Sequence, residues 1–164
     1  MTLATLHGAV LFVAVAVFIA AAMSDARSYL IPNYTCGLLL LMFPLFVATS
    51  PFPVEWVQNV IVFGLVAVLG FVVFMTGQVG AGDIKFFSVA SLWAGPQLIA
   101  VLVFVTALMG GLLSLVVLFA LYVKRSKANE NLRLIKTPVP YGIAIAIGGL
   151  SVLGKLAQPI LLPG

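Results

Sequence analysis

Two aspartates stand at the polar ends of long apolar runs, where a carboxylate is uncommon. Asp25 follows the apolar run 6–23, and Asp83 comes just before another long apolar stretch. A carboxylate placed toward the centre of a membrane helix costs roughly 2.5–3.5 kcal/mol, so such residues face other helices or water and mark candidate functional sites. The other two acidic residues are interpreted as solvated and structural: Glu55 lies near a proline, and Glu130 lies in a basic loop.

Two carboxylates brought together from different helices can do chemistry that one cannot. Like charges a few ångströms apart resist ionising together, so one group keeps its proton while the other stays charged. The charged group can act as general base on a water, and the protonated group can polarise a carbonyl. This arrangement hydrolyses peptides without a metal or a covalent intermediate, and it titrates as a pair.

A simpler interpretation is that each aspartate is a boundary residue neutralised by a nearby cation, Arg27 or Lys85. Residues two apart do not face each other on a helix, so neither cation is well placed to pair with its own aspartate. We interpret the two cations as topology anchors that can also contact a substrate.

Other catalytic chemistries find little support in the residue types. The single cysteine, Cys36, lies in an apolar run and is expected to be a small core residue. The single histidine, His7, is expected at the opposite membrane face, which disfavours a Cys/His or a Ser/His/Asp site. No His and Cys cluster has the spacing of a metal site, so neither a metal nor another cofactor is predicted.

Composition defines the elements that must position the two aspartates. The 164 residues are 63% hydrophobic and 7% charged, with a mean hydropathy of +1.27. Soluble domains carry about 25% charged residues, so a soluble domain, a disordered chain and a nucleic-acid-binding module are excluded. At about 20 residues per membrane helix, this length has room for about six. We predict an all-α, polytopic integral membrane protein with about six transmembrane helices and a single domain, residues 1–164.

The apolar runs and their interruptions give the expected helices. The first run is expected to be a retained helix, because a signal peptide would need a leading positive charge. A polar break is expected over 24–28, and the Gly-Pro-Gln sequence at 95–97 is expected to divide a run too long for one span. The expected helices cover about 6–23, 34–49, 56–75, a short stretch from near 83 to 94, 98–123 and 141–162.

The distribution of cations predicts the topology. If the basic loop 124–136 is cytoplasmic, alternation of the helices places the segments 25–33 and 77–85 on the same side. Seven of the eight cations then lie inside, and Lys155 lies on the other side with His7 and Glu55. The seven are Arg27, Lys85, Lys124, Arg125, Lys127, Arg133 and Lys136.

Small residues predict backbone flexibility at one place and close packing at others. Gly80 and Gly82 flank Ala81, which permits positive φ angles and close approach of another backbone, such as an extended peptide, although a flexible loop would look the same. Glycines also let membrane helices approach closely. We therefore expect helix contacts at Gly110, Gly111 and Ser114 and at Gly148 and Gly149.

Three short segments together resemble a known family. The Gly-Ala-Gly-Asp-Ile-Lys sequence at 80–85 resembles the GxGD motif, extended to GxGDxK, of intramembrane aspartyl proteases of the type IV prepilin peptidase family. The segment 25–33 is similar to the family's first-aspartate motif, an aspartate followed by a basic residue and then Ile-Pro-Asn. The Pro-Tyr-Gly sequence at 140–142 is similar to the segment that opens the last helix of the family. The resemblance covers essentially the whole chain.

The resemblance implies an activity and a site. It implies that Asp25 and Asp83 form the catalytic pair of an endopeptidase. The substrate would be a prepilin or pseudopilin, whose basic leader is removed at the cytoplasmic face of the bacterial inner membrane, among membrane lipids. Residues that support the motifs or contact the substrate would be Gly80, Gly82, Lys85, Arg27, Pro32, Asn33, Tyr141 and Gly142.

The resemblance also implies a branch of the family. Longer members carry a zinc-binding loop with paired CxxC motifs and an N-methyltransferase activity, and this chain has neither the loop nor the cysteines. It looks like the short branch that serves Flp-type (tight-adherence) pili, for which methylation is not expected. The identity of the prepilin and the oligomeric state stay open.

Two alternatives from other classes remain. A small proton-coupled transporter could use the same two aspartates as a proton relay. A transporter usually shows inverted repeats and a polar residue near the bilayer midplane, and we find neither. A non-catalytic membrane factor for pilus assembly would tolerate the loss of both aspartates.

Overall fold

The computed structural model describes residues 3–77, 79–128 and 139–161, which form five helices. The helices are α1 (Leu3–Ser28), α2 (Asn33–Thr49), α3 (Trp56–Met75), α4 (Ala81–Ala128) and α5 (Tyr141–Leu161). The all-α expectation is confirmed. Four of the helices are long and apolar enough to cross a membrane, and α2 is a shorter apolar helix, so the predicted number of about six spans is not shown.

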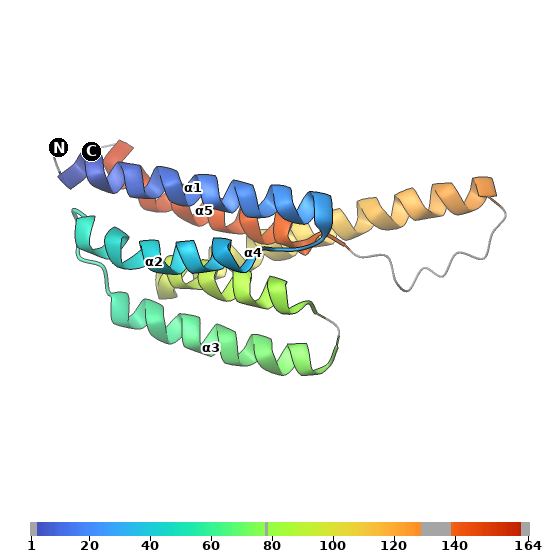
Figure 1. Ribbon diagram of the computed structural model, residues 1–164, viewed down its shortest axis with the longest axis horizontal. Helices are drawn as coiled ribbons and strands as arrows, with labels where there is room; N and C mark the ends of the chain where they lie inside the picture. The colour runs from blue at the N-terminus through green and yellow to red at the C-terminus, as the bar shows by residue number, and fades with distance from the viewer. Residues whose placement is uncertain (1–2, 78, 129–138, 162–164) are drawn as a thin grey trace.

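The helices run lengthwise beside one another, and α4 contacts α2, α3 and α5 (Figure 1). The helices α1 and α5 also lie side by side, and α1 contacts α2. Helices satisfy their own backbone hydrogen bonds, which is what a chain in hydrocarbon requires. The last part of α4, drawn in orange, extends away from the rest of the bundle. The predicted loop residues Glu130, Arg133 and Lys136 lie outside the described residues, as does the end of the last predicted helix at residue 162.

The predicted break at 95–97 is confirmed as an interruption inside α4. Gly95 has φ 56° and ψ −172°, which is not helical, and Pro96 follows. A positive φ suits glycine, and proline lacks the N–H that would continue the ladder. The second part of α4 folds back along the first, so that Thr106 lines the same cavity as Phe87 (Figure 1).

A buried polar side chain of α3 holds this reversal in place. Asn59 is 6% exposed, and its Nδ2 donates a hydrogen bond to the carbonyl oxygen of Leu92 at 2.9 Å. Carbonyls at a helix end lack intrahelical partners, so this bond satisfies one of them. A Cβ at Gly95 would lie 2.9 Å from the same Nδ2, which excludes a larger residue there.

The predicted polar break over 24–28 is wrong, because α1 continues through Ser28. These residues are polar but none is a helix breaker, and the Ser28 hydroxyl donates to the carbonyl oxygen of Ser24 at 2.8 Å. The helix ends instead at Tyr29, which has φ 53°, and Pro32 then precedes α2. Asp25 therefore lies in the last turn of a helix and not in a loop.

The positive φ angles that Gly80 and Gly82 would permit are not adopted. The described glycines with positive φ are Gly77 and Gly95, and α4 already begins at Ala81. The turn at Gly77 directly follows α3, and Gly82 and Asp83 belong to the first turn of α4. Gly80 and Gly82 therefore do not adopt a backbone conformation that requires glycine.

Close helix contacts occur at three of the predicted glycines. A Cβ at Gly148 would collide with Thr106, one at Gly149 with the ring of Phe18, and one at Gly110 with the ring of Tyr141. At Gly111 nothing lies within 4 Å, so the packing prediction is wrong there. The contact between Phe18 and Gly149 draws α1 against α5, which fixes the height of Asp25 relative to the start of α5.

Candidate active site

Asp25 reaches across from α1 to the amino end of α5. Its side chain is 3% exposed, and Oδ2 accepts a hydrogen bond from the backbone N–H of Gly142 at 2.7 Å. The first N–H groups of a helix have no intrahelical partner, and the positive end of the helix dipole favours an anion. A Cβ at residue 142 would lie 2.8 Å from Oδ2, so glycine permits this approach.

Asp83 lies in the first turn of α4, and its side chain is partly buried. A Cβ at Gly80 would lie 3.2 Å from Asp83 Oδ2, closer than ordinary contact, so this glycine leaves room for the carboxylate. A Cβ at Gly82 would lie 3.8 Å from Ile31 Cβ, in ordinary contact. Gly80 thus gives room to the Asp83 carboxylate, and Gly82 faces the segment that follows Asp25.

Both aspartates line one cavity of about 430 Å³ at the end of the bundle. Several of its other lining residues, among them Asn33 and Lys85, are exposed, so the cavity reaches the surface. The two segments that carry the aspartates in the sequence therefore meet in space. The remaining lining residues are Tyr29, Leu30, Ile31, Gly80, Ala81 and Gly82.

The cations near the site do not neutralise the aspartates. Lys85 Nζ donates a hydrogen bond to Asn33 Oδ1 at 3.4 Å, and Arg27 is exposed and does not line this cavity. Within the described part of the chain, neither cation forms an ion pair with Asp25 or Asp83. The neutralisation interpretation is therefore not supported by these contacts.

Two other predicted site residues, Pro32 and Tyr141, do not line the cavity that contains both aspartates. Pro32 precedes α2, and its carbonyl oxygen accepts a hydrogen bond from Thr35 Oγ1 at 2.6 Å, so it shapes the turn and does not line the cavity. Tyr141 lines a second, smaller cavity of about 200 Å³ that also contains Asp83.

Neither the histidine nor a metal-binding group lies at the aspartates. His7 is 18 residues before Asp25 on α1, which corresponds to about 27 Å along the helix. It is buried at the other end of the bundle, where Nδ1 lies 3.2 Å from Thr49 Oγ1. Among the residues with described positions, no group of three or more His, Cys, Asp and Glu side chains could hold a metal ion.

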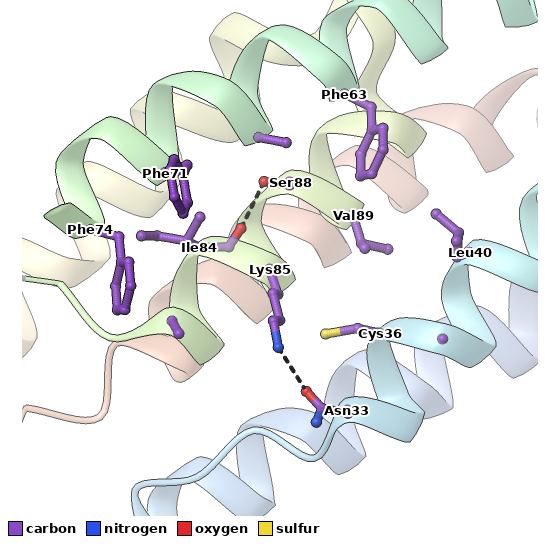
Figure 2. Close-up of a pocket in the computed structure, with 13 residues that line it drawn as sticks. Asn33, Cys36, Leu40, Phe63, Phe71, Phe74, Ile84, Lys85, Ser88 and Val89 are labelled. Atoms are coloured by element: carbon purple, nitrogen blue, oxygen red, sulfur yellow. Dashed lines mark hydrogen bonds between the residues drawn. The ribbon is translucent and has the colours of Figure 1, made fainter.

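An apolar groove of about 580 Å³ adjoins the site (Figure 2). Figure 2 shows Phe71 and Phe74 of α3 on one side of it and Cys36 and Leu40 of α2 on the other, with Lys85 reaching toward Asn33. Cys36 is buried as predicted, although it lines this groove.

Some site residues were not singled out from the sequence. Tyr29, Leu30 and Ala81 lie inside the quoted segments but carry no obvious chemistry. Thr106 lines the smaller cavity with Asp83, and its hydroxyl is buried. A hydroxyl in the middle of an otherwise apolar run is a signal that could have identified Thr106, because polar groups inside membrane helices usually have a purpose.

The fold and the site define a class of protein: a multi-pass helical membrane protein with two aspartates in one cavity at the end of the bundle. The sequence profile of the type IV leader peptidase family matches residues 12–115, a range that contains both aspartates. The match covers more than half of the chain, and the chain belongs to this family of aspartic leader peptidases. No curated protein matches the chain, and no solved structure does.

Proposed function

We propose that this peptidase is an intramembrane aspartyl endopeptidase that removes the basic leader from prepilin-like proteins at the cytoplasmic membrane face. The observation that carries the proposal is that Asp25 and Asp83, from different helices, line one surface cavity. Family membership supports prepilins as the substrate class. The short-branch assignment to Flp-type pili and a single peptidase domain over residues 1–164, without methyltransferase activity, belong to the same proposal.

In the proposed mechanism the two aspartates have different roles. The N–H of Gly142 and the amino end of α5 stabilise negative charge on Asp25, which assigns it the role of general base. Asp83, protonated, donates a hydrogen bond to the scissile carbonyl oxygen and transfers this proton to that oxygen as the tetrahedral intermediate forms. A water attacks the carbonyl carbon and gives its proton to Asp25. The tetrahedral intermediate then collapses, the C–N bond breaks, the new amine receives the proton from Asp25, and Asp83 recovers its own.

The surrounding residues have supporting roles in this proposal. Gly80 and Gly142 leave room for the two carboxylates, and Gly82 brings the first turn of α4 near Ile31. The hydrogen bond between Lys85 and Asn33 links α4 to the start of α2 at the edge of the cavity. Tyr141 and Pro32 set the start of α5 and α2, and Arg27 faces the headgroups.

The proposal includes six membrane crossings with the site on the cytoplasmic side. The 17 residues of α2 extend about 26 Å, close to the thickness of the hydrocarbon core. The reversal at Gly95 divides α4 into two crossings, of which the first is short. The excess of Lys and Arg on the side of the aspartates supports the cytoplasmic orientation.

A cleavage assay in proteoliposomes tests the function. We would offer a prepilin to the wild type, Asp25→Asn and Asp83→Asn, and check the folding of each by thermal melting. Removal of a general acid or base lowers the rate by about 100-fold to 10,000-fold, so both variants should lose cleavage. Glu55→Gln is the control, because Glu55 is exposed and lines a cavity that contains neither aspartate. Full processing by either Asp variant would refute the two-aspartate mechanism.

A further inference from the structure

A groove between α2 and α3 leads toward the aspartates. The two helices are consecutive in the chain, yet each packs against α4 and hardly against the other. The first part of α4 forms the floor of the groove, through Ile84, Lys85 and Val89 (Figure 2). Phe71 and Phe74 of α3 are exposed along its side. The groove therefore opens on the side of the bundle that faces lipid.

The lining of the groove is apolar except at one end. Among the described residues, Lys85 is the only charged one that lines it, and its Nζ is held at the end of the groove by Asn33. The hydroxyl of Ser88 donates to the carbonyl oxygen of Ile84 at 2.8 Å, so it offers no free donor. Such a surface can bind an apolar segment, and apart from Lys85 it has no charged group that could pair with a charged segment.

The groove is continuous with the cavity that holds the aspartates. Asn33, Ala81 and Lys85 line both, and Asp83 lies two residues before Lys85 on the first turn of α4. A chain segment lying in the groove therefore reaches, at these three residues, the edge of the cavity that the aspartates line.

The size of the groove fits one side of a helix. A helix about 10 Å across occupies about 120 Å³ for each 1.5 Å of rise. The 580 Å³ of the groove then corresponds to about five fully embedded residues, or about ten that are half embedded.

We propose that the groove binds the apolar helix of the substrate, on the carboxyl side of the cleaved bond, and that the basic leader lies beyond the aspartates. The proposal rests on the proposed function. Lys85 repels a basic leader from the end of the groove, which sets the direction of the substrate. Lipid tails are as apolar as the substrate helix, so the groove distinguishes the helix from lipid by packing and by the charge of Lys85.

The only cysteine in the chain provides a direct test, because Cys36 lines the groove. We would use the Asp83→Asn variant, which retains the substrate uncleaved, with a prepilin carrying single cysteines at successive positions. A mild oxidant forms a disulfide only where the two Cβ atoms come within about 4.5 Å. Cross-links are expected from positions after the cleavage site, repeating every three or four residues, and not from the leader. The Cys36→Ser variant should remove them.

A second measurement fills the groove without touching the aspartates. Ala67 lines the groove, and Ala67→Trp should lower kcat/KM for prepilin cleavage about 10-fold or more by competing with the helix. Leu69→Trp is the matched control on the same helix, because Leu69 is 65% exposed and outside the groove. Its kcat/KM should stay within about twofold of the wild type.

The outcomes separate the two proposals. Cross-links from the leader, or from no position although the wild type cleaves the same prepilin, would overturn the groove assignment and leave the peptidase function standing. Wild-type kcat/KM in a folded Ala67→Trp variant would overturn it as well. Failure of the wild type to cleave any prepilin would instead count against the proposed function.

Discussion

Replacing Gly142 by alanine tests whether the position of the Asp25 carboxylate limits cleavage. A Cβ at residue 142 would lie 2.8 Å from Asp25 Oδ2 and 2.8 Å from Ile31 Cδ1, whereas ordinary contact begins at 3.4 Å. Neither neighbour is the free end of a long flexible chain. The carboxylate therefore has to move, and its hydrogen bond from the Gly142 N–H, now 2.7 Å, lengthens or breaks.

The expected effect on rate is much larger than the effect on folding. A hydrogen bond to a charged group contributes about 1.5–3 kcal/mol, and a displacement of about 1 Å in a catalytic group lowers the rate about 100-fold. Overpacking costs about 1–3 kcal/mol of stability, which the better helix propensity of alanine offsets by up to about 1 kcal/mol. We expect a modestly destabilised variant whose cleavage rate falls by about two orders of magnitude.

The assay is the single-turnover rate of prepilin cleavage in proteoliposomes, measured beside a thermal melt. Gly154→Ala is the matched control on the same helix, because nothing lies within 4 Å of a Cβ at that position. It should cleave at the wild-type rate. If Gly142→Ala melts within a few degrees of the wild type and cleaves as fast, then the contact with Gly142 does not set the position of Asp25, and the reasoning is wrong.

Three further predictions follow from other parts of the bundle. The Thr106 hydroxyl is the only buried side-chain polar atom in the described residues without a hydrogen-bond partner. Thr106→Val should therefore raise the free energy of unfolding by about 1–3 kcal/mol. A lower melting temperature than that of the wild type would contradict this. Gly95→Ala should be destabilised by about 1–2 kcal/mol or more, because Gly95 has φ 56° and packs on Asn59. Gly64→Ala is the control: nothing lies within 4 Å of a Cβ at that position, so this variant should melt at or above the temperature of the wild type. The cleavage rate should fall at low pH, where both aspartates are protonated, and at high pH, where both are ionised. A cleavage rate that stays constant from about pH 4 to 9 would exclude a proton shared by the two aspartates.

The aspartates could be predicted from the sequence because their signals are local. Each lies at the boundary of an apolar run within a short segment, and membrane energetics make a carboxylate there conspicuous. The continuation of α1 through Ser28 could not be predicted in the same way. Polarity marks where a helix leaves the hydrocarbon, but it does not end the helix, which requires a residue such as Tyr29 with positive φ or a following proline.

Features that depend on distant parts of the chain were not predictable. The bond between Gly142 and Asp25 joins residues 117 apart, and no local pattern reports it. The groove exists because α2 and α3 both pack on α4, and this packing depends on tertiary contacts between distant segments. The Gly-Pro sequence at 95–96 did predict an interruption, but the direction of the chain after it depends on Asn59, which lies on another helix.

The location of Asp25 makes its charge depend on a helix other than its own. The last turn of α1 carries the negative end of a helix dipole, which opposes a carboxylate at Asp25. The amino end of α5 reverses this for Asp25 through the Gly142 N–H. Gly142 lies outside the range 12–115 that the family profile matches, yet its N–H is the group that contacts Asp25. The packing of Phe18 against Gly149 that joins α1 to α5 is therefore part of what holds Asp25 against the amino end of α5.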